Sequence, residues 1–234
     1  MNTAEQRYLV AGCKPWNRRV FAGRLASLPG EWRFVAGREE LTPGLIAEFR
    51  PRFVFFLHWS WIVPEAVLNA AECVCFHMTD VPYGRGGSPL QNLIVRGHRE
   101  TKLTALRMCA ELDAGPVYLK CPLSLEGGAE EILVRASELS ADMIATLIRL
   151  RPEPQPQSGE VTLFKRRRPE ESLIPSLPGL PALHDFIRML DADGYPRAFL
   201  EHAGFRYEFA RAVRYDGRVV ADVTITASPS APSS

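Results

Sequence analysis

His77 is the first candidate for acid–base chemistry in this chain of 234 residues. A short apolar stretch leads into it, and a loop rich in glycine and proline follows at residues 82–89. The ordinary pKa of imidazole lies near neutral pH, so this side chain can accept and return a proton under physiological conditions. Its position alone leaves catalysis and a structural role equally open.

Asp113 lies in a predicted tight turn, residues 111–116 (ELDAGP). Taken alone, an aspartate before Ala-Gly is most simply a turn former. A carboxylate beside an imidazole, however, orients the ring, fixes its tautomer and raises its basicity. Together, His77 and Asp113 therefore suggest a proton-transfer pair.

The loop after His77 contains residues 84–88 (GRGGS), whose backbone N–H groups and Arg85 could cradle an anion. It is not a Walker loop, because it lacks the Gly-Lys-Ser/Thr ending. The first predicted strand leads into residues 12–15 (GCKP), a poor match to GxGxxG, which disfavours a nicotinamide dehydrogenase. For the basic run at residues 165–168 (KRRR), phosphate binding and a solvated surface are both open.

Two tryptophans, Trp59 and Trp61, lie in residues 57–64 (LHWSWIVP) at the end of a predicted strand. A core or lid role is the simplest interpretation. Their position modestly favours the alternative, a wall for a flat heteroaromatic ligand.

The elements that must position these residues alternate between strand and helix. The stretch at 52–57 is apolar in succession, as in a strand that is buried on both faces. This alternation predicts an α/β fold with a doubly wound, mostly parallel sheet, and His77 at the carboxyl edge where such sheets bind ligands. The predicted strands are 7–12, 32–36, 52–57, 73–76, 102–111 and 117–123, and the predicted helices are 15–28, 43–49, 65–71, 91–96 and a long amphipathic helix over 132–148.

The C-terminal part begins after a Pro-rich connector at 151–159, which we expect to be extended. We predict a short strand at 161–165, an irregular stretch at 174–183, a helix at 184–191 and a β-hairpin formed by 205–213 and 218–226. The predicted organisation is a catalytic domain at 1–165, a small C-terminal region at 166–227 with the helix and hairpin, and a frayed tail at 228–234.

Composition indicates a folded protein, with 46% hydrophobic and 24% charged residues. A net charge of +1 gives no general attraction to nucleic acid or membrane. No apolar run is long enough to span a bilayer, and the N-terminus lacks the apolar core of a signal peptide. The five cysteines form an odd set without CxxC spacing, so we expect buried, reduced thiols in a cytoplasmic protein and no zinc.

Four segments resemble the folate-dependent formyltransferases, the superfamily of methionyl-tRNA formyltransferase and the sugar-nucleotide N-formyltransferases. Residues 59–64 resemble its aromatic-Gly-x-Ile-Leu-Pro segment on the pterin side, and residues 75–91 (CFHMTDVPYGRGGSPLQ) resemble its Asn-x-His core. Residues 111–115 resemble its Leu-Asp-Thr/Ala-Gly turn, and residues 186–199 its Ile-Arg…Tyr-Pro-Gly-Ala-Phe segment. Residues 77–92 are most similar to short sugar formyltransferases of the pseudaminic acid type and to the formylation domain of linear gramicidin synthetase.

The resemblance implies 10-formyltetrahydrofolate as formyl donor, no metal, and a primary amine as acceptor. We expect an amino-sugar nucleotide, hence a small-molecule partner rather than nucleic acid or membrane, and leave a homodimer open. The amine would attack the formyl carbon, with His77 as base or proton shuttle oriented by Asp113. The expected cofactor-binding residues are Trp59, Trp61, Ile62, Pro82 and Asp113, and the expected substrate-binding residues are Arg85, Gly86, Gly87, Ser88 and Asn92.

Cys75 is the main departure from the family pattern, because the family has an asparagine two residues before its histidine. That asparagine donates a hydrogen bond to the developing oxyanion, whereas a thiol is a weak donor. Loss of such a donor typically costs about 10²–10³-fold in rate. Protonated His77, a backbone N–H of the glycine loop, or Asn92 could replace it. Formylation of methionyl-tRNA or of a small hydroxyornithine-like amine, and a silent sugar-nucleotide binding homologue, are the alternatives.

Overall fold

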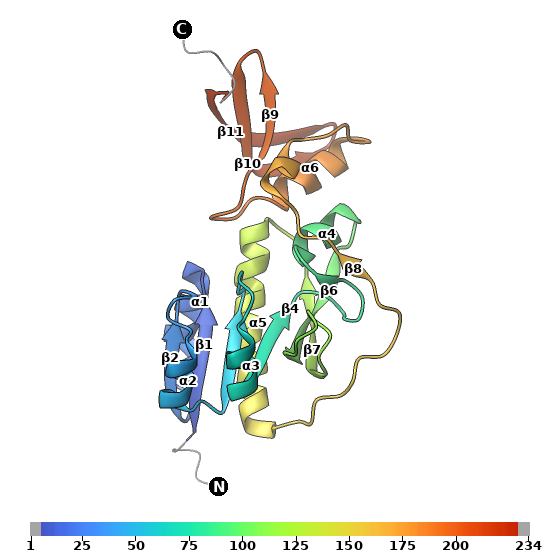
Figure 1. The fold of residues 1–234 in the computed structure, drawn as a ribbon. Coiled ribbons are helices and arrows are strands. Elements are labelled where there is room, and N and C mark those ends of the chain that lie inside the picture. Colours follow the sequence, from blue (N-terminus) through green and yellow to red (C-terminus); the bar gives the residue numbers. More distant parts are fainter. Residues whose placement is uncertain (1–5, 229–234) are drawn as a thin grey trace. The chain divides into compact units, whose positions relative to one another are not determined.

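A computed structural model describes residues 6–228, and it groups the chain into two compact units (Figure 1). Of the described residues, the first unit contains those up to Gly86, Thr101–Leu123 and Val134–Leu163. The second contains Gly87–Glu100, Ser124–Leu133 and the described residues from Phe164 to Ser228. The domain boundary at residue 165 stays a prediction.

The first unit is built on a six-stranded sheet with the order β2-β1-β3-β4-β6-β7. The pairs β1–β2, β1–β3 and β3–β4 are parallel, whereas β4 and β6 are antiparallel. The predicted mostly parallel α/β sheet is therefore confirmed. Its strands are β1 (Arg7–Gly12), β2 (Glu31–Val35), β3 (Phe53–Leu57), β4 (Glu72–His77), β6 (Glu100–Arg107) and β7 (Val117–Ser124).

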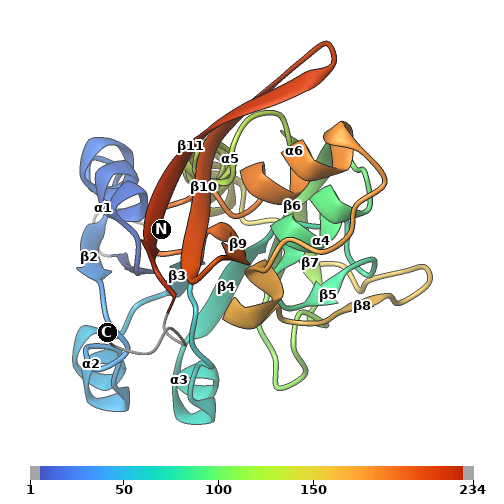
Figure 2. The same cartoon turned by 90° about the horizontal axis from the view of Figure 1, so that it is seen from above.

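Helices cover both faces of this sheet, which explains why every residue of β3 is buried (Figure 2). On one face, α2 (Pro43–Phe49) and α3 (Glu65–Ala70) contribute to an apolar cluster with the strands. On the other lie α1 (Pro15–Val20) and α5 (Ala129–Leu150), which are joined by a hydrogen bond of 2.9 Å from Asn17 Nδ2 to Ser137 Oγ.

Two predicted elements of the first unit are shorter than expected. The helix predicted at 15–28 is α-helical only to Val20 and continues as a wider π-helical turn, Phe21–Leu25, around Gly23, a residue of low helix propensity. The strand predicted at 102–111 ends at Arg107, because the chain then turns so that the Arg107 N–H donates to the Pro116 carbonyl at 2.9 Å.

The Pro-rich connector is bonded to the first unit along much of its length. Gln155 exchanges backbone hydrogen bonds of 2.7 and 2.8 Å with Val117. Further along, the Thr162 N–H donates to the Pro82 carbonyl, and the Thr162 carbonyl accepts from Arg85. The strand predicted at 161–165 is limited to β8 (Leu163–Phe164), which pairs with β5 (Arg85–Gly86).

The second unit contains a three-stranded antiparallel sheet, in which the predicted hairpin is present and has a third strand beside it. The sequence prediction missed that strand, β9 (Ala198–His202), because only two of its residues are buried. The predicted helix begins earlier than 184, since Pro181 suits a first helical turn. The other elements are β10 (Phe205–Tyr215), β11 (Arg218–Ala227), α4 (Pro89–Val95), α6 (Leu180–Arg188) and a 3₁₀ helix (Pro169–Ser172).

The five cysteines are separate thiols, but burial was predicted correctly only for Cys73. Cys109 is exposed, since it lies in the turn after β6, and the other three are partly buried. Within residues 6–228, no helix combines the length and apolar character needed to cross a bilayer, and no cluster of three metal-ligating side chains is found. Of the tail predicted to fray, Ser228 donates to the Gly204 carbonyl at 2.8 Å, and residues 229–234 lie outside the described part.

Candidate active site

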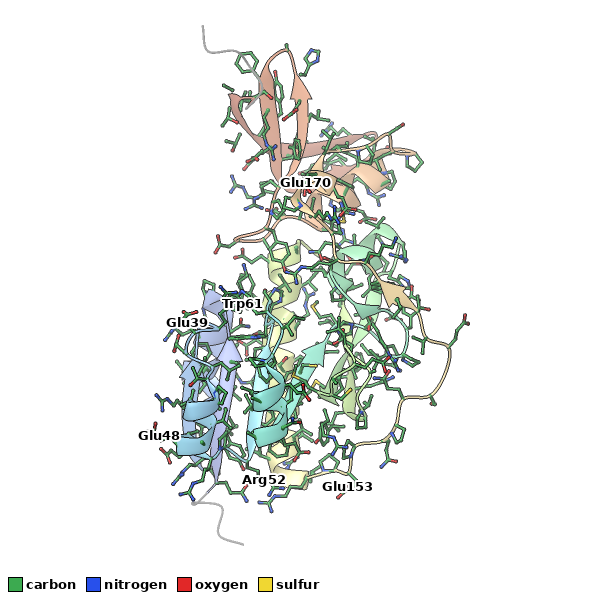
Figure 3. All side chains as sticks on the ribbon, viewed as in Figure 1. Glu39, Glu48, Arg52, Trp61, Glu153 and Glu170 are labelled. Carbon is green, nitrogen blue, oxygen red and sulfur yellow. The ribbon has the colours of Figure 1, made fainter. Side chains whose placement is uncertain are left out.

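The carboxyl ends of the parallel strands β3 and β4 carry three of the residues predicted to form the site. His77 is the last residue of β4, and Trp59 and Trp61 follow the end of β3. In Figure 3, Trp61 lies at this end of the unit, whereas Glu48 and Arg52 lie at the opposite end. Open α/β sheets bind their ligands at the carboxyl ends of their strands, so the location is suitable for a site.

His77 is only 8% exposed, and both of its ring nitrogens face oxygen atoms. Nε2 lies 2.8 Å from the Gly84 carbonyl oxygen, and Nδ1 lies 3.5 Å from Asp113 Oδ2. A carbonyl oxygen only accepts, so Nε2 must carry a hydrogen and donate it. The Gly84 carbonyl therefore fixes the hydrogen on Nε2, and Nδ1 faces the Asp113 carboxylate. The predicted proximity of His77 and Asp113 is confirmed.

Asp113 is held by a turn with unusual backbone geometry. Its φ of 53° lies in the left-handed region, which aspartate tolerates better than most residues. Its Oδ2 also accepts a hydrogen bond of 3.0 Å from the Gly86 N–H. Two residues later, a Cβ on Gly115 would lie 1.7 Å from the Arg107 carbonyl oxygen, so the turn requires glycine. This close packing aims the Asp113 carboxylate at His77.

The Gly84 carbonyl that meets His77 is supported by two buried threonines. Thr79 Oγ1 donates to the same carbonyl at 3.3 Å, and Thr104 Oγ1 donates to the Thr79 carbonyl at 2.7 Å. Both threonines are fully buried, which makes their hydrogen bonds important for the loop. The sequence analysis missed these residues because nothing in their local pattern indicates a partner.

Cys75 lies two residues before His77 on β4, so both side chains point to the same face of the sheet. The thiol packs against the apolar cluster between the sheet and helices α2 and α3. Burial, and after it the Asp113 carboxylate, raise the pKa of the Cys75 thiol well above its ordinary value. Cys75 therefore stays a protonated thiol at neutral pH and offers only a weak hydrogen-bond donor.

This pKa shift predicts a clear order of thiol reactivity. Alkylation requires an accessible thiolate, so iodoacetamide is expected to modify exposed Cys109 in the folded protein and to leave Cys75 unmodified up to about pH 9. Peptide mapping by mass spectrometry at increasing pH measures both rates. Urea-unfolded protein, in which both cysteines are expected to react, is the control. Rapid modification of Cys75 in the folded state would contradict its assigned environment.

The other predicted replacements for the missing asparagine already have acceptors. Asn92 Nδ2 lies 3.2, 3.0 and 3.0 Å from the carbonyl oxygens of Gly87, Ser88 and Lys165. In the glycine loop, the N–H groups of residues 85, 86 and 87 donate to Thr162, Asp113 and Phe164. The His77 ring also faces protein acceptors, but its Nδ1 contact with Asp113 Oδ2, at 3.5 Å, is longer than these.

The loop residues predicted to bind substrate make bonds within their own units. In the first unit, Arg85 Nε donates to Gln157 Oε1 at 3.0 Å, and its side chain is 12% exposed. In the second, a Cβ on Gly87 would lie 2.4 Å from that of Arg166, and Ser88 Oγ accepts from the Arg167 N–H at 3.0 Å. Binding of an anion by this loop stays a prediction, because the structure shows these groups engaged with protein atoms.

The residues predicted to hold the pterin differ in exposure. The rings of Trp59 and Trp61 meet edge-on with centroids 4.9 Å apart, and Trp61 is 38% exposed. Trp59 Nε1 is buried and has no hydrogen-bond partner among the described residues. Ile62 is 84% exposed, whereas Pro82 is buried. A ring wall with an unpaired N–H donor suits a flat heteroaromatic ligand that has acceptor atoms.

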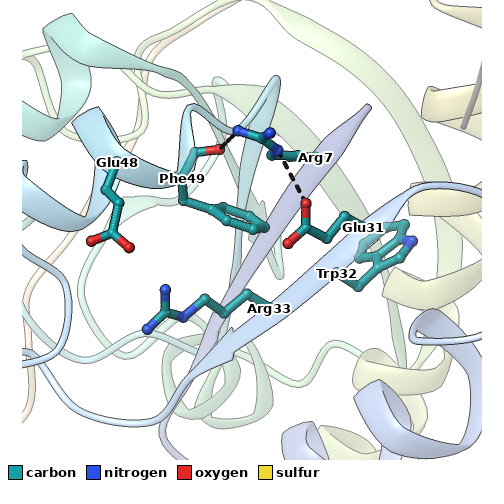
Figure 4. A pocket seen from close by; sticks show the side chains of 6 residues that line it. All are labelled: Arg7, Glu31, Trp32, Arg33, Glu48 and Phe49. Atoms are coloured by element: carbon teal, nitrogen blue, oxygen red, sulfur yellow. Dashed lines mark hydrogen bonds and ion pairs between the residues drawn. The ribbon is translucent and has the colours of Figure 1, made fainter. Parts of the chain in front are cut away.

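A separate hollow of about 360 Å³ lies at the amino ends of β1 and β2 (Figure 4). Arg7 crosses it and donates to Glu31 and to the Phe49 carbonyl, both at 3.1 Å. It opens at the edge of the sheet opposite His77, so we do not assign the chemistry to it. Its lining residues are Arg7, Glu31, Trp32, Arg33, Glu48 and Phe49.

Comparison with known proteins identifies the family. The family described as "Methionyl-tRNA formyltransferase, C-terminal domain" matches residues 169–226. A solved structure, methionyl-tRNA formyltransferase from Clostridium thermocellum, is 41% identical with a TM-score of 0.91, over 95% of this chain and 100% of that one. The chain belongs to the formyltransferase superfamily. The predicted superfamily is therefore confirmed.

Other members refine the comparison. Methionyl-tRNA formyltransferase from Ruegeria pomeroyi is 34% identical over 156 residues, which are 63% of this chain and 51% of that protein. This chain thus spans about half the length of the curated relatives it matches. A 4-N formyltransferase from Francisella tularensis shares the fold with a TM-score of 0.67 at 13% identity, over 95% of this chain and 97% of that one. The expected similarity to sugar enzymes of the pseudaminic acid type is not supported, because the two relatives at 34% and 41% identity carry the methionyl-tRNA name.

Proposed function

We propose that this protein is an N-formyltransferase that moves a formyl group from 10-formyltetrahydrofolate to a primary amine. The observation that carries the proposal is the buried contact of His77 with Asp113, at the two positions where the family motifs have their histidine and aspartate. Membership of the formyltransferase superfamily supports the same reaction.

The pair is suited to proton transfer as the amine reacts. The bound donor would supply the activated formyl group. Nδ1 of His77 is the less tightly held ring nitrogen, since it lies 3.5 Å from Asp113 whereas Nε2 lies 2.8 Å from Gly84. Nδ1 is therefore the atom that would exchange a proton with the reacting groups, while the Asp113 carboxylate stabilises the charged ring.

Because Cys75 stands where the family has an asparagine, the His77 ring would also have to stabilise the oxyanion. The imidazolium that forms when His77 takes up the proton of the amine would donate the hydrogen bond to the oxyanion from Nδ1, because Nδ1 has a longer contact, 3.5 Å to Asp113 Oδ2, than the Gly86 N–H has to the same carboxylate, 3.0 Å. Such a donor contributes about 10²–10³-fold in rate. Trp59 and Trp61 would form the wall for the pterin ring, with Trp59 Nε1 as a donor to it.

Methionyl-tRNA is the acceptor we favour, as the relatives at 34% and 41% identity carry that name. In the second unit, Lys165, Arg166 and Arg168 are exposed in the basic run, and such side chains contact phosphates. The proposed catalytic domain, 1–165, would carry out the chemistry. The proposed C-terminal region, 166–227, would contribute most of the basic run. An amino-sugar nucleotide is the second candidate, since the match to the 4-N formyltransferase covers nearly all of both chains.

Formylation assays with both acceptors test this choice. Methionyl-tRNA is expected to be formylated, with kcat/KM falling by at least about tenfold between 50 and 200 mM salt if only a few phosphates are contacted. Free methionine is the control, because it presents the same amine without phosphates. Formylation of an amino-sugar nucleotide with no reaction of methionyl-tRNA would overturn the acceptor assignment and leave the formyl transfer intact.

A further inference from the structure

Gln157 bonds to both loops that surround the His77–Asp113 pair. It lies between α5 and β8, and its side chain is partly buried. Nε2 donates to the carbonyl oxygens of Asp113 and Gly115, each at 2.8 Å. Oε1 accepts a hydrogen bond of 3.0 Å from Arg85 Nε. Both donor hydrogens of the amide and its oxygen are thus used.

The two carbonyl contacts fix the turn that presents the carboxylate. Asp113 has a left-handed φ of 53°, a conformation that surrounding contacts must hold in place. The Gln157 amide bonds on both sides of Ala114 and so prevents this turn from opening. Because Asp113 Oδ2 lies 3.5 Å from His77 Nδ1, a movement of the turn would change that distance directly.

The third contact fixes the loop on the other side of the histidine. Arg85 stands between Gly84, whose carbonyl accepts from His77, and Gly86, whose N–H donates to Asp113. The bond from Arg85 to Gln157 therefore links the loop at residues 84–86 to the turn that carries Asp113.

The backbone around Gln157 is itself anchored. Before it, Gln155 exchanges two backbone hydrogen bonds with Val117. After it, Thr162 exchanges two with Pro82 and Arg85. A side chain on a segment fixed at both ends can hold its partners with little loss of further conformational freedom.

We infer that Gln157 is a positioning residue for formyl transfer, whose amide holds the Asp113 turn and the Arg85 loop so that the carboxylate and the Gly84 carbonyl meet the His77 ring. This inference rests on the proposed function. Gln157 acts through Asp113 and Arg85 and bonds to neither His77 nitrogen.

Two substitutions separate the roles of the amide. Gln157→Ala is expected to lower kcat about tenfold to 10²-fold, as for a misplaced catalytic group, with the KM values unchanged. Gln157→Glu keeps an oxygen for Arg85 but offers no hydrogens to the Asp113 and Gly115 carbonyls, so it is expected to lower kcat as much. The matched control is Gln155→Ala, whose exposed side chain bonds to the Glu153 carbonyl at 3.2 Å, and which is expected to stay within about twofold of wild type.

Hydrogen exchange gives a readout that does not depend on activity. In the protein without substrates, Gln157→Ala is expected to speed exchange of the Gly86 N–H by about tenfold or more, and Gln155→Ala is expected to leave it unchanged. Wild-type kcat in Gln157→Glu, or unchanged Gly86 exchange in Gln157→Ala, would overturn the inference. If the wild-type protein transferred no formyl group, the proposed function would fail, while the exchange experiment would still decide whether Gln157 holds the two loops.

Discussion

The His77→Ala variant is expected to transfer formyl groups about 10²–10⁴-fold more slowly than the wild-type protein. The substitution removes the ring that contacts the Asp113 carboxylate and, in the proposed mechanism, both moves the proton and stabilises the oxyanion. Initial rates at saturating 10-formyltetrahydrofolate measure the loss. Because the amine substrate and the formyl donor retain their other contacts with the protein, most of the effect should appear in kcat.

His202→Ala is the matched control for this prediction. His202 is an exposed residue of β9, in the second unit, and its removal is expected to change the rate by less than about twofold. Circular dichroism of both variants establishes that they are folded. A His77→Ala protein that is folded and has wild-type turnover would remove His77 from the mechanism.

Gly115→Ala is expected to destabilise the protein by about 3 kcal/mol or more, as overpacking of a tight site does. An added Cβ would lie 1.7 Å from the Arg107 carbonyl oxygen, which is backbone and cannot rotate away. The turn would have to move from β6 and lose the hydrogen bond of 2.9 Å between the Arg107 N–H and the Pro116 carbonyl. Since this turn carries Asp113, formyl transfer should decrease as well.

Gly23→Ala is the control, and it is expected to change the free energy of unfolding in the opposite direction. Gly23 is exposed in the π-helical turn after α1, and an added Cβ would meet no atom within 4 Å. Alanine is expected to stabilise this site by about 0.5–1 kcal/mol, because it has the higher helix propensity. Thermal or urea unfolding measures both variants, and equal stability of the two would contradict the close packing of Gly115.

The fold was predictable because its signals are local, and the central pair was predictable because both residues lie in motifs that resemble those of the family. The alternation of apolar strands and amphipathic helices indicated the sheet, and the positions of His77 and Asp113 within recognisable motifs indicated their contact. Strand β9 was missed since it has only two buried residues and no alternating pattern. Its place in the sheet depends on pairing with β10 rather than on its own composition.

The surroundings of the pair were not predictable, since they depend on partners far apart in the chain. Arg85 suggested an anion site in a glycine loop, and its bonds to Gln157 and Glu111 appear only when the chain is folded. Gln157 was assigned to a linker because its neighbours are prolines, whereas its amide reaches a turn 44 residues earlier. Such contacts leave no periodic pattern in a single sequence.

The decisive measurement is the transfer of a radiolabelled formyl group from 10-formyltetrahydrofolate to an acceptor amine. Methionyl-tRNA and an amino-sugar nucleotide are the two acceptors, and the wild-type and His77→Ala proteins are assayed side by side. We predict label on an acceptor amine with the wild-type protein and a loss of at least about 10²-fold with the variant. A wild-type protein that binds tetrahydrofolate but places no label on either amine would contradict the assignment of this chain as a formyltransferase that uses its His77–Asp113 pair.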